Sequence, residues 1–114
     1  MWTISGNQLL LEAGHAASFP LPISECQQVE DVLVVVLDVS GRNHMTENVF
    51  GVTPQGQILW QIEPRPDISR DPVNYYTGIS SDYLPDRVGL GSWAGIAVDV
   101  DIHSGKFVNS FVTK

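Results

Sequence analysis

The sequence of residues 30–39 is EDVLVVVLDV, and six consecutive residues within it, Val32–Leu37, are apolar. Successive side chains of a strand point to opposite faces of a sheet, so a strand that is apolar at every position has both faces buried. Six residues are far fewer than the roughly 20 that a membrane-spanning helix needs. The stretch therefore predicts a central strand with a layer of structure packed on each face.

Shorter segments on both sides of this stretch predict further strands. No run of ten or more residues has the apolar period of an amphipathic helix, and glycines and prolines interrupt the chain throughout. Tight turns are expected at Gly6-Asn7, at residues 53–56 and at residues 102–105, where glycine tolerates positive φ. We expect an all-β fold: an antiparallel meander of seven or eight strands that forms a sandwich or partly open barrel, with little or no helix.

Length and composition fit a single β-domain that covers residues 1–114. Hydrophobic residues make up 43% of the chain, which is enough for a packed core and excludes disorder as the overall state. The side chains expected to dominate that core are Val32, Val34, Val36, Val49, Ile58, Trp60, Ile96, Val98, Val100, Phe107 and Phe111.

The charge balance bounds the class of partner. The chain has 13 Asp and Glu residues against 6 Lys and Arg, and its net charge is −7. Nucleic-acid binding needs a basic surface, so that class of function is excluded. Cys26 is the only cysteine, so no internal disulfide can form, and the first residues lack the pattern of a secretory signal. The expected location is the cytoplasm, with no membrane partner.

A weak internal repeat links two parts of the chain. Residues 52–59 align with residues 101–108, 49 positions later, and each copy is a strand, a polar turn ending in glycine and a second strand. The segments NVFGVTPQGQILWQIEP and GIAVDVDIHSGKFVNSFV resemble the hairpins of quinoprotein-type (PQQ-like) β-propeller repeats, and Trp60 matches the tryptophan position of those repeats. The second copy departs from the pattern, with Asn109 or Ser110 there. Small uncharacterised bacterial β-domain proteins share this kind of double hairpin.

The resemblance implies blade-like hairpins, but it does not imply a closed propeller. A propeller needs at least about four blades of four strands each, more than seven or eight strands can supply. Quinone binding is therefore not carried over from the resemblance, and we expect no cofactor beyond an optional divalent metal.

A metal site is one hypothesis for the polar positions near the last turn. Alternation along a strand places Asp99, Asp101 and His103 on one face, and carboxylates with an imidazole are suitable ligands for a divalent metal. The chain would then be a metal-binding protein or a small metal-dependent enzyme. The same pattern also arises in a half-buried hairpin arm whose polar face meets water, with Asp101 capping the turn.

No recognisable catalytic motif accompanies these residues, so the chain is not expected to carry catalytic residues and an enzymatic role is disfavoured. None of the histidines lies beside a nucleophile motif, and no glycine cluster matches a phosphate loop. Cys26 follows Glu25, whose charge raises a thiol pKa, so an inert structural thiol is expected.

The favoured hypothesis is a non-enzymatic bacterial binding or protein-interaction module that uses a long surface loop at residues 64–93. This segment is rich in proline and aspartate, and one short strand is expected near residues 75–80. Its partner would be a protein or a small molecule. The aromatic residues in or beside the loop form either a binding surface or the loop's own small core: Trp60, Tyr75, Tyr76, Tyr83 and Trp93.

The acidic residues suggest a further alternative. Six aspartates lie after residue 63 and would steer a basic partner, as expected for an immunity-type inhibitor of a basic toxin enzyme; solubility explains the same charge. Exposed edge strands are also expected to allow a homodimer.

Overall fold

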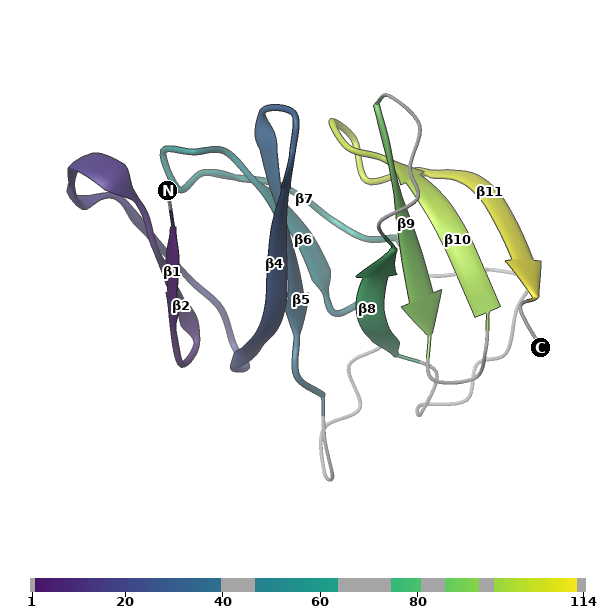
Figure 1. Ribbon diagram of the computed structural model, residues 1–114, viewed down its shortest axis with the longest axis horizontal. Helices are drawn as coiled ribbons and strands as arrows, with labels where there is room; N and C mark the ends of the chain where they lie inside the picture. The colour runs from purple at the N-terminus through teal and green to yellow at the C-terminus, as the bar shows by residue number, and fades with distance from the viewer. Residues whose placement is uncertain (1, 40–46, 64–74, 81–85, 93–95, 113–114) are drawn as a thin grey trace.

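The computed structural model describes residues 2–39, 47–63, 75–80, 86–92 and 96–112. This part of the chain forms eleven strands and one short 3-10 helix, η1 (Glu12–Gly14). The strands make three antiparallel sheets that stack face to face along the long axis of the molecule (Figure 1). The all-β antiparallel class is confirmed. In the residues described here, no helix is long and apolar enough to cross a membrane.

Each sheet is a meander whose strands lie in chain order. The N-terminal sheet contains β1 (Thr3–Ser5), β2 (Gln8–Leu10) and β3 (Ala16–Ser18). The middle sheet contains β4 (Ile23–Val29), β5 (Val32–Leu37), β6 (Val49–Val52) and β7 (Ile58–Gln61). The C-terminal sheet contains β8 (Tyr76–Ser80), β9 (Arg87–Ser92), β10 (Ile96–Asp101) and β11 (Phe107–Val112).

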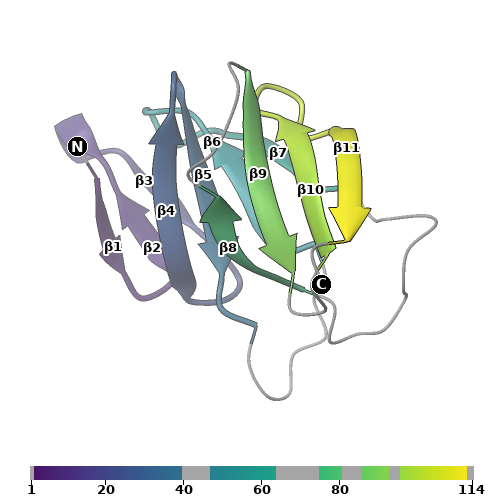
Figure 2. The same ribbon diagram turned by 45° about the vertical axis from the view of Figure 1, so that its right-hand side comes forward.

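The expected number of seven or eight strands is wrong, because the described residues form eleven. The turn expected at Gly6-Asn7 does join β1 to β2, whereas β3, β4 and β9 were not expected. Strand β3 has only three residues, too few to show an alternating pattern, and the buried positions of β4 do not alternate. The three sheets form a stack of three layers, in which each pair of neighbouring sheets is a small sandwich (Figure 2).

Strand β5 belongs to both cores of this stack. All six of its residues are buried. Val32, Val34 and Val36 pack toward the C-terminal sheet, whereas Leu33, Val35 and Leu37 pack toward the N-terminal sheet. The prediction of a central strand covered on both faces is confirmed.

The core between the middle and C-terminal sheets contains most of the predicted core residues. Its buried members are Val29, Val32, Val34, Val36, Val49, Trp60, Ile62, Tyr76, Val88, Leu90, Val98, Val100 and Ile102, with Phe107 partly buried against them. The prediction for Ile58 is wrong: its side chain is 51% exposed, because it lies at the start of the edge strand β7, next to a turn. The side chains of Ile96 and Phe111 lie outside the described part.

One buried polar side chain crosses this apolar core. Asn48 is fully buried, and its Nδ2 donates to the carbonyl oxygens of Leu37 and Tyr76, each at 2.9 Å. Its Oδ1 accepts the backbone N–H of Tyr76 at 3.0 Å. A buried polar group without such partners would cost free energy. Asn48 therefore determines where the first residue of β8 sits against the middle sheet.

Replacing Asn48 by alanine should destabilise the protein by about 2 kcal/mol or more, because the substitution removes three hydrogen bonds and leaves the backbone of Tyr76 without them in the core. Urea unfolding followed by circular dichroism measures this loss. The matched control is Asn7→Ala, which removes one bond, from Nδ2 to the Phe19 carbonyl, at an exposed residue and should cost less than about 1 kcal/mol. Equal losses in the two variants would contradict the assigned role of Asn48.

Candidate functional site

One end of the molecule gathers equivalent turns from all three sheets, at the top of Figure 1. The turns β2–β3, β6–β7 and β10–β11 contain Gly14, Gly56 and Gly105, whose φ angles are 79°, 90° and 73°. A backbone hydrogen bond closes the outer end of each turn: Leu11 N to His15 O, Thr53 N to Gln57 O and Asp101 N to Lys106 O. The two hairpins of the sequence repeat are therefore β6–β7 and β10–β11. The third copy, β2–β3, had no detectable signal in the sequence.

Trp60 is part of the joint between two sheets. The side chain is 6% exposed, and its Nε1 donates to the Ile102 carbonyl at 2.7 Å. A Cβ atom on Gly105 would lie 2.5 Å from the Trp60 ring, so only glycine leaves room for the ring. The role of Trp60 in the described structure is therefore packing between the middle and C-terminal sheets.

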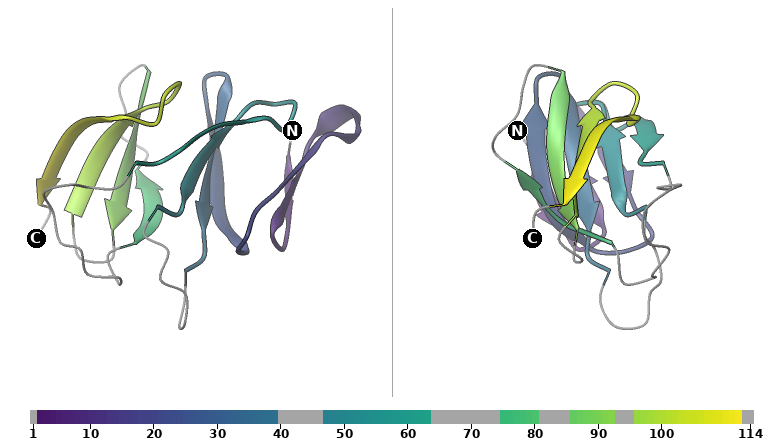
Figure 3. Two further views of the ribbon diagram at one scale, coloured as in Figure 1. Left: turned by 180° about the vertical axis from the view of Figure 1, so that it is seen from behind. Right: turned by 90° about the vertical axis from the view of Figure 1, so that its right-hand side faces the viewer.

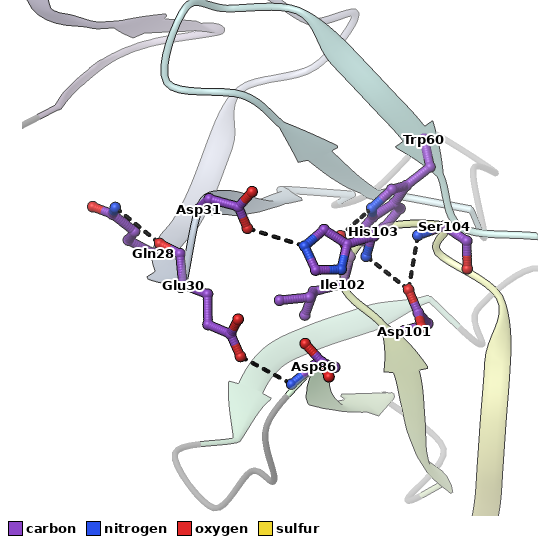
Figure 4. Close-up of polar contacts among 9 residues, drawn as sticks. All are labelled: Gln28, Glu30, Asp31, Trp60, Asp86, Asp101, Ile102, His103 and Ser104. Atoms are coloured by element: carbon purple, nitrogen blue, oxygen red, sulfur yellow. Dashed lines mark hydrogen bonds and ion pairs between the residues drawn. The ribbon is translucent and has the colours of Figure 1, made fainter.

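An acidic joint lies beside this tryptophan, where the β4–β5 turn meets the C-terminal sheet (Figure 4). The Glu30 carboxylate accepts the backbone N–H of Asp86 at 3.0 Å. Asp31 Oδ1 lies 3.0 Å from Nε2 of His103. Glu30 and Asp86 both have positive φ, 54° and 67°, which non-glycine residues rarely adopt. Both strained residues are thus held by the same contact between sheets.

Two further carboxylates of the middle sheet bind backbone donors on the edge strands of the C-terminal sheet. Glu25 Oε1 accepts the N–H of Ile79 in β8, at 3.3 Å, and Glu63 Oε1 accepts the N–H of Phe107 in β11, at 3.1 Å. Unpaired donors on edge strands invite pairing with other chains. These carboxylates stabilise the stack and also cap two such donors.

The structure separates the three residues of the metal hypothesis. Asp101 Oδ1 accepts the backbone N–H groups of His103 and Ser104, at 2.8 and 3.0 Å, and so caps the turn. The His103 ring is directed at Asp31 (Figure 4), while Asp99 lines the outer face of the C-terminal sheet. Among the described residues, no group of three His, Cys, Asp or Glu side chains is close enough to hold a metal ion.

The carboxylates around His103 alter its titration. The hydrogen bond to Asp31 raises the pKa of His103; burial opposes this increase, and the charges of Asp31, Asp101 and Asp86 add to it. The same hydrogen bond lowers the pKa of Asp31. A raised histidine pKa stabilises the fold below the unfolded value, about 6.5, and this stabilisation is lost as the pH rises through the folded pKa. A lowered aspartate pKa stabilises the fold above about pH 3.9, and this stabilisation is lost as the pH falls through the folded pKa.

The Asp31→Asn variant should therefore have a lower pKa at His103 than the native protein, because the charged acceptor is removed. The stability difference between the two proteins should be largest between about pH 4 and pH 6.5 and should shrink on either side. An NMR titration of the His103 imidazole measures the pKa. The control is Asp38→Asn, an exposed carboxylate just beyond the other end of β5. An unchanged His103 titration in Asp31→Asn would show that the pair does not form in solution.

The lone thiol matches its sequence interpretation. Cys26 is buried in the core between the N-terminal and middle sheets. Burial raises the pKa of the thiol to about 12, and the charge of Glu25 adds to the increase. The thiolate, which is the reactive form, is therefore scarce at neutral pH.

Native protein at pH 8 should react with a thiol reagent such as 5,5′-dithiobis(2-nitrobenzoic acid) at least about 100-fold more slowly than the same protein in urea, because both burial and the high pKa protect Cys26. The absorbance of the released thiolate measures the rate. Similar rates in the two states would mean that the core around Cys26 opens readily.

Two members of the predicted aromatic binding set, Trp60 and Tyr76, lie in the core between the middle and C-terminal sheets. Tyr76 is 2% exposed and lies in the core, and Tyr75 is partly buried. Tyr83 and Trp93 lie outside the described residues. The segment 64–93 contains the expected strand, β8, and a second strand, β9, that was not expected. In β9 the outward positions are Gly89 and Gly91, so the sequence shows only two apolar residues in alternation.

The outer face of the C-terminal sheet is hollow. The hollow has a volume of about 500 Å³, within the range of ligand sites. A Cβ atom on Gly91 would meet nothing within 4 Å. This face is turned to the viewer in the right-hand view of Figure 3. The residues that line the hollow are Thr77, Gly78, Ile79, Ser80, Gly89, Leu90, Gly91, Ala97, Val98 and Asp99.

These features describe a stack of three antiparallel sheets with a tryptophan and carboxylates where the middle and C-terminal sheets meet. The chain belongs to the family described as Domain of unknown function (DUF7957), whose sequence model matches residues 1–111. No curated protein matches the chain.

Solved structures that are similar to the chain include BamB from Moraxella catarrhalis and a computationally designed protein, Ika8. BamB from Moraxella catarrhalis superposes with a TM-score of 0.62 and 19% identity over 96% of this chain and 32% of that chain. The computationally designed Ika8 protein superposes with a TM-score of 0.60 and 13% identity over 96% of this chain and 35% of that chain. The chain thus spans about a third of the length of either structure. At these identities the likeness shows the fold alone, and it supports the propeller-like resemblance.

Proposed function

We propose that this chain is a non-enzymatic binding module and that its partner is held on the hollow outer face of the C-terminal sheet. The observation that carries the proposal is the hollow of about 500 Å³, whose lining includes the small residues Gly89, Gly91 and Ala97. The opposite face of the same sheet is fully packed through Val88, Leu90, Val98 and Val100. The face lies largely within residues 64–93, the segment expected from the sequence.

The chemistry of the face favours a polypeptide partner. A floor of glycine and alanine lets another backbone approach closely. Thr77, Ser80 and Asp99 offer hydroxyl and carboxylate groups along the rim for hydrogen bonds. Val108, in the neighbouring strand β11, is 44% exposed and adds an apolar contact. A sheet face or an extended segment with donors toward Asp99 fits this pattern.

Tyr76 is unsuitable for testing partner binding, because its removal would empty part of the core. Gly91→Arg is a better variant: the new side chain has open space and fills the hollow. The variant should capture at least about tenfold less partner than the native protein does. Its free energy of unfolding should change by less than about 0.5 kcal/mol. Cross-linking to immobilised protein in extract of the source cell, followed by quantitative mass spectrometry, measures the capture.

The matched control is Ser18→Arg, which places the same side chain at an exposed strand position of the N-terminal sheet. Its capture should equal that of the native protein. Capture that survives in Gly91→Arg, or an extract from which the native protein captures nothing above background, would overturn the proposal.

A further inference from the structure

The register of the C-terminal sheet places one carboxylate in the hollow of its outer face. Ser80, Gly89 and Asp99 lie side by side across β8, β9 and β10. A Cβ atom on Gly89 would lie 3.0 Å from the Cβ of Ser80 and 3.5 Å from Oδ1 of Asp99. The Asp99 carboxylate therefore borders the space that a side chain at position 89 would fill.

The neighbouring row of the same face leaves room for a long side chain. This row consists of Gly78, Gly91 and Ala97, which also lie side by side across the three strands. No side chain in it is longer than a methyl group, and both rows line the hollow of about 500 Å³. The hollow thus combines open space that crosses three strands with a single negative charge at its border.

Asp99 differs from the carboxylates that hold the stack together. Each of those carboxylates makes a hydrogen bond within the fold: Glu25, Glu30, Asp31, Glu63 and Asp101. Asp99 is only partly exposed, yet within the described residues its carboxylate has no hydrogen bond and no ion pair. Arg87, which strand alternation places on the same face, is not paired with it. A partly buried charge that the fold does not neutralise is complementary to a cation from outside.

The chemistry of the hollow favours a guanidinium as that cation. A guanidinium is planar, and two of its N–H groups can bond to both oxygens of one carboxylate. The hydroxyl oxygens of Thr77 and Ser80 line the same hollow and can accept further N–H groups. The aliphatic stem of an arginine can lie on the row of small residues while its head reaches Asp99. The net charge of −7 would also steer a basic group toward the chain.

We propose that the polypeptide partner inserts an arginine side chain into this hollow. Its stem lies along Gly78, Gly91 and Ala97, and its guanidinium binds the Asp99 carboxylate. The inference rests on the proposed function, because it names the chemical group by which that partner is recognised.

The probe is the pentapeptide AARAA, acetylated at one end and amidated at the other, titrated into the whole native chain. The amide NMR signals of Gly89 and Gly91 should shift saturably, because both residues line the occupied hollow. The matched control peptide carries citrulline in place of arginine. Citrulline has nearly the same shape but no charge, so this peptide should bind at least about tenfold more weakly.

A variant of the chain tests the carboxylate itself. Asp99→Asn should bind the arginine peptide at least about tenfold more weakly than the native protein does. Its thermal unfolding should be unchanged, because the substitution removes no hydrogen bond of the described fold. The control is Asp38→Asn, which neutralises an exposed carboxylate that does not line the hollow and should bind the peptide as the native protein does.

The inference would be overturned by any of three results: no saturable shift at Gly89 and Gly91, equal binding of the citrulline peptide, or undiminished binding to Asp99→Asn. The proposed function is tested separately, by the capture of partner on Gly91→Arg. If capture from the extract is lost in Gly91→Arg but unchanged in Asp99→Asn, the hollow is the binding face and arginine is not the group that it recognises. If capture survives in Gly91→Arg, the proposed function itself fails.

Discussion

The amide of Asn48 lies in an apolar core, so its donors and acceptor must be satisfied by protein atoms. It bonds to Leu37 at the end of β5 and to both backbone groups of Tyr76 at the start of β8. Apolar packing alone is non-directional and would allow the sheets to slide. The amide removes that freedom, and Trp60, Glu30 and Asp31 can then reach their partners on the C-terminal sheet.

Several features could be predicted from the sequence because their signals are local. The uninterrupted apolar run of β5 indicated two covered faces, and the spacing of Gly56 and Gly105 indicated repeated hairpins. Other elements left no local signal. Strand β3 is only three residues long, and β9 carries glycines at Gly89 and Gly91 on its outer face, so neither shows a clear period of two.

The site was harder to predict because its contacts join residues far apart in the chain. Strand alternation alone would place Asp99, Asp101 and His103 on one face, but Asp101 caps the turn, as the alternative interpretation of the sequence expected. The contact of His103 with Asp31, 72 residues earlier, had no signal in the sequence. The burial of Trp60 depends on Gly105 in another sheet. Asn48 gave no signal at all, because its importance arises from Tyr76, 28 residues later.

The hydrogen bonds between the middle and C-terminal sheets are asymmetric in one respect. The middle sheet contributes side chains, namely Glu25, Glu30, Asn48, Trp60 and Glu63. Their partners on the C-terminal sheet are almost entirely backbone N–H and C=O groups. Every residue type except proline has both a backbone donor and a backbone acceptor. A substitution at one of the backbone partners in the C-terminal sheet therefore leaves the hydrogen bond intact. A substitution of one of the bonding side chains in the middle sheet breaks it. A divergent C-terminal sheet can thus dock in the same place, and the sequence of its outer face can change without altering the stack.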